Sequence, residues 1–292
     1  MQPCTKQYNG LDYADNFGNI YCLRNLQVQA SSHFILANCF FKIATVYSNQ
    51  QLKHNMKTQY FPAAAMGKKD IGWLKSNFFF SFSDYYDPLK SAFGTLVAFN
   101  DDLLEKGKGF GIHPHVNMEI ISILLKGKMN HKDSLDYSTL IEEGGVQIMS
   151  AGSGLRHEEY NIGEDEVNFL QIWIQPKLQN ITPRYQLRHF SKAGRRNKLT
   201  TIVSGKEGLA HCWINQNAEL LLGYYDNGSQ VTHSFNPTNK CLFVFVIAGT
   251  LSIEGTPIAQ REAIGIWDTG SITIDCTSDT EFLIIETPVN QK

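Results

Sequence analysis

The sequence carries little charge, and the charge it has is almost balanced. Lysine, arginine, aspartate and glutamate together account for 18% of the 292 residues, and the formal net charge is −2. Such a balance gives no long-range attraction to nucleic acid or to an anionic membrane, so we expect neither as a direct partner. The chain also lacks any run of about 18 uncharged apolar residues, the length that a membrane-spanning helix needs.

Closely spaced cysteine pairs are absent as well. Six cysteines lie scattered along the chain without a CxxC motif: Cys4, Cys22, Cys39, Cys212, Cys241 and Cys276. In a chain of this length, such cysteines indicate reduced and mostly buried thiols rather than a disulfide framework. This usage favours a cytoplasmic location.

The first part of the chain differs from the rest. Residues 1–55 are rich in asparagine and glutamine, hold three of the six cysteines and show no sustained hydrophobic period. We expect them to be an N-terminal extension, either poorly ordered or the product of a start codon upstream of Met56. The remainder is long enough for two domains, which we place at residues 56–176 and 177–292.

From Gly72 onward, short segments rich in aromatic and β-branched residues alternate with turn residues, a pattern typical of strands. A break at Pro176, Pro183 and Arg195-Arg196 is interpreted as a linker over 176–196. No long amphipathic helix stands out, so we expect an all-β fold of two tandem barrels or sandwiches. The predicted strands are 77–82, 94–100, 118–125, 128–132, 145–149, 155–159 and 168–174, then 220–225, 242–248, 250–254, 263–267, 271–275 and 281–286.

Two pairs of polar residues at alternate positions indicate a metal site. Side chains two apart on a strand share a face, so His113 and His115 present two imidazoles together while Pro114 points away. Because proline cannot donate to a sheet ladder, this segment should lie at a strand start or at a sheet edge. By the same alternation, His157 and Glu159 share a face farther along the chain.

Three imidazoles and one carboxylate around a common point suit Fe(II), Mn(II), Co(II), Ni(II) or Zn(II). A single glutamate leaves a divalent ion with net positive charge, so an anionic oxygen ligand could join it. Glu119 is an alternative to Glu159, since it is four residues from His115 and returns to the same face. His131 is interpreted as an exposed hairpin residue. We expect structural roles for the unpaired histidines, His189, His211 and His233.

The segments around these residues resemble the pirin family of two-cupin proteins. Residues 109–115 (GFGIHPH) and 149–159 (MSAGSGLRHEE) resemble its first and second cupin motifs. Three further segments are similar to the family's opening signature and central hairpin: 72–76 (GWLKS), 80–88 (FSFSDYYDP) and 131–134 (HKDS).

The resemblance implies an all-β fold of two tandem cupin (jelly-roll β-barrel) domains. It assigns His113, His115, His157 and Glu159 as ligands in the first domain, where Glu119 is not used, and it implies a second domain without a metal site. Iron(II) is the expected metal; Mn(II), Co(II), Ni(II), Zn(II) or Cu(II) would also fit. The chain departs from the family pattern at Val116, which stands where arginine is usual, and in two turns, 143–145 and 135–137.

Bacterial members of the family resemble quercetin 2,3-dioxygenases, which implies a flavonol and O2 as reaction partners. The bound metal would polarise the flavonol oxygens, and Glu159 is the candidate catalytic base for the 3-hydroxyl proton. Carbon monoxide and a depside would be the products. The alternative implied by other pirins is a metal-dependent, non-enzymatic cofactor that binds a transcription factor or a metabolic enzyme. Fold alone does not decide between them.

Overall fold

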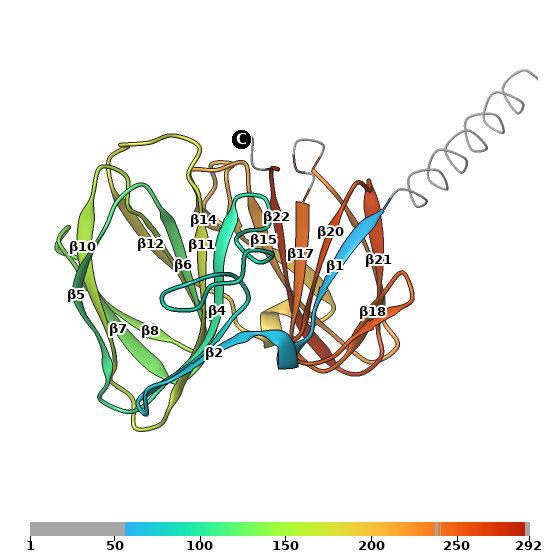
Figure 1. Ribbon diagram of the computed structural model, residues 1–292, viewed down its shortest axis with the longest axis horizontal. Helices are drawn as coiled ribbons and strands as arrows, with labels where there is room; N and C mark the ends of the chain where they lie inside the picture. Colours follow the sequence, from blue (N-terminus) through green and yellow to red (C-terminus); the bar gives the residue numbers. More distant parts are fainter. Residues whose placement is uncertain (1–55, 237–238, 240, 290–292) are drawn as a thin grey trace, which may run out of the picture. The chain divides into compact units, whose positions relative to one another are not determined.

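The computed structural model describes residues 56–236, 239 and 241–289, whose regular secondary structure is almost wholly antiparallel β-strand (Figure 1). Over these ranges the only helical elements are two 3₁₀ turns, η1 (Ala63–Ala65) and η2 (Ala193–Arg195). No helix among the described residues is long and apolar enough to cross a membrane. The predicted extension at residues 1–55 lies outside the described residues.

The first half of the described chain forms a barrel from two sheets that face each other. The smaller sheet has four strands in the order β5 (Gly109–His115), β10 (Leu155–Asn161), β7 (Lys128–Asp133) and β8 (Ser138–Glu142). The larger sheet has seven, in the order β12 (Arg184–His189), β9 (Gly145–Ser150), β6 (Glu119–Lys126), β11 (Val167–Ile174), β4 (Leu96–Leu104), β3 (Leu74–Phe78) and β2 (Gly67–Asp70).

The second half repeats this arrangement. Its seven-stranded sheet runs β1 (Lys57–Phe61), β20 (Ala263–Trp267), β17 (Cys241–Ala248), β22 (Thr280–Thr287), β15 (Glu219–Tyr225), β13 (Lys198–Ser204) and β14 (Cys212–Trp213). Its four-stranded sheet runs β16 (Gln230–Ser234), β21 (Ser271–Cys276), β18 (Leu251–Ile253) and β19 (Thr256–Ile258). The prediction of an all-β fold with two tandem cupin barrels is therefore confirmed.

Two end strands cross the boundary predicted between the halves. β1 precedes the first barrel in sequence, yet it pairs with β20 in the large sheet of the second barrel, with Lys57 opposite Trp267. β12 lies beyond residue 176, yet it pairs with β9 of the first barrel, with Arg184 opposite Ser150. The domain boundary at 176–177 stays a prediction, but the large sheets are not divided there.

The predicted linker over 176–196 is wrong in its central part, which is strand β12. Pro183 ends the irregular segment instead of marking a longer loop, because proline is tolerated immediately before a strand. Tyr185 is only 7% exposed and packs into the first barrel, although the surrounding basic and polar residues suggest a surface segment. The sequence pattern also missed β13, which pairs with β15.

Aromatic rings join the two barrels. Phe79 and Phe99 of the first half pack against Phe243 and Phe245 of the second, and all four are at most 1% exposed. The rings of Phe99 and Phe245 lie 4.9 Å apart at their centroids, and those of Phe99 and Phe243 lie 5.1 Å apart. Each buried phenylalanine contributes about 1.5–3 kcal/mol through lost contact with water, so the halves share one apolar core.

The three cysteines within the described residues are buried and unpaired: Cys212, Cys241 and Cys276. This agrees with the expectation of reduced, buried thiols. The other three cysteines lie outside the described residues.

Candidate metal centre

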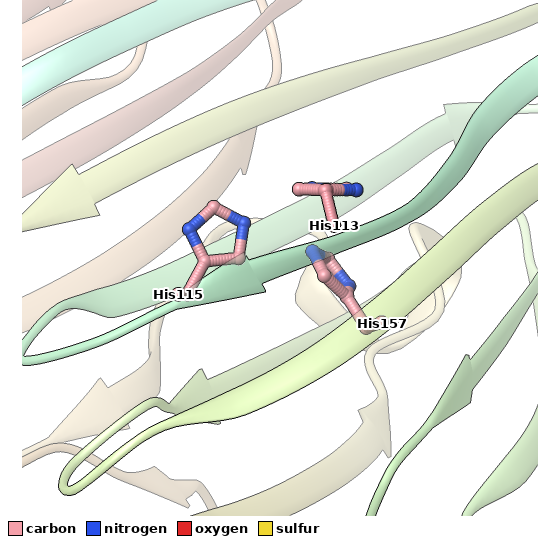
Figure 2. A group of neighbouring side chains, drawn as sticks. All are labelled: His113, His115 and His157. Atoms are coloured by element: carbon pink, nitrogen blue, oxygen red, sulfur yellow. The ribbon is translucent and has the colours of Figure 1, made fainter.

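Three histidines converge inside the first barrel, on two neighbouring strands (Figure 2). β5 and β10 are antiparallel, and their register sets His157 directly opposite His113. The His157 ring lies 4.4 Å from that of His113 and 5.0 Å from that of His115, measured between centroids. One ring nitrogen from each of the three residues lies within 4.8 Å of the others. The alternation argument thus predicted their common face correctly.

The local sequence explains why these strands present the histidines inward. β5 is the end strand of its sheet, so Pro114 deprives no neighbour of a hydrogen bond, as expected from its place in the motif. The turn before β10 depends on Gly152, which has φ of +48° and whose added Cβ would lie 2.1 Å from the Ile181 carbonyl oxygen. Any side chain there would push the turn away and shift His157.

Glu159 is placed by an irregularity in the pairing of β5 and β10. The register shifts between His157 and Glu159, so Glu159 stands opposite Phe110. Gly109 permits the close approach, since a Cβ at that position would lie 2.2 Å from the Glu159 carbonyl oxygen. The Glu159 carboxylate is 1% exposed and accepts a short hydrogen bond from Gln147 Nε2.

Glu159 belongs to a second group that overlaps the first. Ligand atoms of His131, His157 and Glu159 lie within 4.8 Å of one another, and His157 is common to both groups. Glu159 also lines the same pocket as His113 and His115. All four predicted ligands therefore lie in one region of the first barrel.

His131 was predicted to be exposed, and this is wrong. It is fully buried, because β7 lies between β10 and β8, and its register puts it opposite Glu159. Its Nε2 donates to Asp133 Oδ2 at 2.8 Å, and its ring stacks on Tyr185 with centroids 4.4 Å apart. The alternation of His131 and Asp133 on one strand was a signal of the same kind as the one that located His157 and Glu159.

The protonation states of the cluster suit a cation. Burial, reinforced by the neighbouring imidazoles, lowers the pKa of His115 to about 4, so this ring is neutral near pH 7. Burial likewise lowers the pKa of His157 to about 4. His113 Nδ1 lies 2.8 Å from the Gly111 carbonyl oxygen and donates to it, which leaves the Nε2 lone pair free. Neutral imidazoles are the form that binds metals.

The pKa values of Glu159 and His131 depend on each other. Burial alone would raise the pKa of Glu159, but the nearby imidazoles of His131 and His157 outweigh it and hold the pKa below its usual range. Burial also opposes protonation of His131, yet Glu159 and Asp133 together raise its pKa. His131 thus acts as a positive or donating neighbour behind the carboxylate, which stays ionised.

One nitrogen atom of the cluster has no hydrogen-bond partner among the described residues. His157 Nε2 is buried and makes no hydrogen bond to any described residue. An unpaired buried nitrogen is unfavourable unless something binds it. Three imidazoles and one ionised carboxylate are a donor set that fits a divalent transition metal, and the free nitrogen belongs to His157, which is common to both groups.

A pocket of about 340 Å³ opens beside the cluster. Aromatic side chains form much of its wall: Trp73, Phe78, Phe82, Phe110 and Trp173. Trp173 packs edge-on against the His115 ring, with centroids 5.2 Å apart. Polar side chains also reach the pocket, among them Asp102, whose burial raises the pKa to about 7.

Glu119, the alternative ligand, is directed away from the histidines. Its carboxylate accepts hydrogen bonds from Ser150 Oγ at 2.7 Å and from the Asn215 backbone N–H at 3.2 Å. The three histidines given structural roles also have other partners. His189 and His211 contact the carbonyl oxygens of Glu143 and Lys206, and His233 contacts the carboxylate of Glu286.

Comparison with known proteins places this chain in a family. Residues 59–174 match the family model described as Pirin, and residues 201–287 match the quercetinase C-terminal cupin domain. The quercetin 2,3-dioxygenase of Escherichia coli (strain K12) is 36% identical over 223 residues, which cover 76% of this chain and 95% of that protein. The chain belongs to the pirin family.

Other relatives agree with this membership. A pirin-like protein of Caulobacter vibrioides is 34% identical over 226 residues, covering 77% of this pirin and 97% of the relative. The crystal structure of the bacterial pirin YhhW from Escherichia coli in complex with nickel(II) superposes with a TM-score of 0.76 at 34% sequence identity. That alignment covers 80% of this pirin and 100% of the YhhW chain.

Proposed function

We propose that this pirin is a dioxygenase that opens the flavonol ring of quercetin with O2, using one iron(II) ion held by His113, His115, His157 and Glu159. The observation that carries the proposal is the free, buried Nε2 of His157, which clusters with His113 and His115 beside an aromatic pocket. The names of the quercetin 2,3-dioxygenase relatives support the choice of substrate.

The pocket fits the proposed substrate in size and character. A volume of about 340 Å³ lies in the range of pockets that hold small organic ligands, about 300–1,000 Å³. A flat flavonol can lie against the rings of Trp73 and Phe110, which pack edge-to-face with centroids 5.9 Å apart. These walls exclude water and direct one edge of the flavonol toward the histidines.

The side chains around the cluster have separate tasks. The bound metal would supply Lewis-acid activation of the flavonol 3-hydroxyl and 4-carbonyl oxygens and a binding position for O2. Glu159 remains ionised and accepts the proton of the 3-hydroxyl group. His131 and Gln147 hold the Glu159 carboxylate in place through the contacts described above, and His113 is oriented by its hydrogen bond to Gly111.

The proposal is tested by measuring oxygen consumption and carbon monoxide release with quercetin and the iron-loaded protein. His157→Ala should lose both bound iron and turnover. His189→Ala is the matched control, because this exposed histidine hydrogen-bonds to the Glu143 carbonyl and does not line the pocket beside the cluster, and it should keep both. Full iron content and full turnover in His157→Ala would refute the ligand assignment.

The same assay distinguishes the regulatory alternative. A metal-binding protein that acts by contacting a transcription factor or an enzyme would bind iron through the same residues. It would consume no oxygen with quercetin, and it would retain a specific protein in a pull-down that depends on His157.

A further inference from the structure

Strand β4 carries polar side chains on both of its faces. Asn100 and Asp102 point into the first barrel and line the pocket beside the histidines. Asp101, between them, points the other way, where its Oδ1 accepts hydrogen bonds from Asn168 Nδ2 at 2.8 Å and Arg261 Nη1 at 3.0 Å. The carboxylate on the outer face is thus hydrogen-bonded to two side chains, whereas polar atoms on the inner face are not.

Several polar atoms at the pocket are buried without a partner. They are Asn100 Oδ1, Asp102 Oδ1 and Trp173 Nε1, and none of them makes a hydrogen bond to any described residue. Asn100 is 2% exposed and Asp102 is 3% exposed. Native proteins rarely leave such groups unpaired, and three of them around one pocket indicate that something else completes their hydrogen bonds.

The side chains define the chemistry of the missing partner. The Asn100 and Asp102 oxygens accept hydrogen bonds, and the Trp173 N–H donates one. Phenolic hydroxyl groups both donate and accept, so they match this set. The surrounding aromatic side chains favour a flat ring that carries them.

We propose that Asn100, Asp102 and Trp173 form a polar subsite that binds ring hydroxyl groups of the flavonol other than its 3-hydroxyl. The inference rests on the function proposed above. It implies that these residues determine which flavonols bind. A metal-facing 3-hydroxyl and 4-carbonyl are common to all flavonols, so discrimination must come from groups elsewhere in the pocket. A site built to bind a hydroxyl group discriminates strongly against analogues that lack it.

The test compares two flavonols that share the metal-facing groups. Quercetin carries four hydroxyl groups besides the 3-hydroxyl, and 3-hydroxyflavone carries none. Dissociation constants are measured without oxygen, using the quenching of tryptophan fluorescence in the nickel(II)-loaded full chain. Asp102→Ala should weaken quercetin binding about tenfold, the effect of one lost hydrogen bond in a buried site, and leave 3-hydroxyflavone unchanged.

Conservative variants separate recognition from folding. Asp102→Asn keeps the shape and a donor and acceptor, and it should bind quercetin within about threefold of the wild type. Trp173→Phe removes only the N–H and part of the ring. It should again weaken the binding of quercetin and leave the binding of 3-hydroxyflavone unchanged. Asp101→Asn is the matched control, since it makes the same change on the opposite face of β4 and should alter neither constant.

The outcomes for the subsite and for the enzyme are distinct. Equal weakening of both flavonols in Asp102→Ala, or no change in either, would overturn the subsite even if the iron-loaded protein consumes oxygen. A quercetin preference that disappears in Asp102→Ala would support the subsite even if no oxygen is consumed. In that second case it is the proposed dioxygenase activity that fails.

Discussion

The buried Glu119 carboxyl group should make the stability of the protein depend on pH. Glu119 is 0% exposed, and one of its oxygens, Oε1, has no partner among the described residues. Burial raises its pKa from 4.5 to about 7. Because the folded protein holds this proton more tightly than the unfolded chain does, Glu119 adds stability that is complete below pH 4.5 and is lost as the pH rises through about 7.

The size of the effect follows from the two pKa values. A pKa difference of about 2.5, at about 1.4 kcal/mol for each pH unit, corresponds to about 3 kcal/mol of unfolding free energy. About 2.5 kcal/mol of this should be lost between pH 5 and pH 8, because a small part is already lost at pH 5. Glu119→Gln has no proton to lose, so it should escape this loss.

The assay is equilibrium unfolding by guanidinium at pH 5 and pH 8, with metal removed from both proteins. The free energy of unfolding of Glu119→Gln minus that of the wild type should be about 2.5 kcal/mol larger at pH 8 than at pH 5, so that the variant gains relative stability as the pH rises. Groups that titrate in both proteins, such as Asp102, cancel in this difference. Glu105→Gln, the same change at an exposed position, is the control and should show no such dependence.

A difference between Glu119→Gln and wild type that is equal at the two pH values would refute the reasoning. The variant also separates the two glutamates considered as ligands. Glu119 is bonded to Ser150 and Asn215, so its substitution should leave metal binding intact, whereas loss of the metal would show that Glu119 belongs to the centre.

Three further changes test the site, the core and the thiols. His131→Gln should weaken metal binding about 10- to 100-fold in a competition titration, because the imidazole that supports Glu159 is lost. Phe243→Ala should lower the unfolding free energy by about 3–5 kcal/mol in urea, since it opens a cavity in the core shared by the barrels. Burial raises the pKa of the three described cysteines to about 11: Cys212, Cys241 and Cys276. Iodoacetamide should therefore leave these thiols unmodified in the native protein at pH 8. Peptide mass spectrometry should find them labelled only when the protein is unfolded in denaturant.

Local periodicity was sufficient for the parts of the site that depend on a single strand. The spacing of His113 and His115, and of His157 and Glu159, requires only that each segment be extended, because side chains two apart then share a face. Pro114 likewise indicated an edge position, because proline cannot donate to a sheet ladder. These features are properties of short segments and are visible without any knowledge of pairing.

Features that depend on pairing between distant strands were not predictable in this way. The burial of His131 results from its position opposite Glu159 in the middle of a sheet, and nothing near residue 131 reveals that register. Tyr185 lies in a segment that resembles a loop, yet it covers the His131 ring. The place of Asp102 in the pocket was missed for a similar reason. Its neighbour Asp101 is the same type of residue but faces the other way, and the sequence alone does not show which of the two faces the pocket.

The placement of β1 and β12 bears on how the chain could be divided. A break in the peptide between the two halves would leave the large sheet of the second half without β1, and a break before residue 184 would deprive the first half of β12. Each fragment would then present an uncovered row of backbone donors and acceptors, which invites self-association. The two halves should therefore be soluble only when produced together, and mixing the separate fragments should restore a paired molecule.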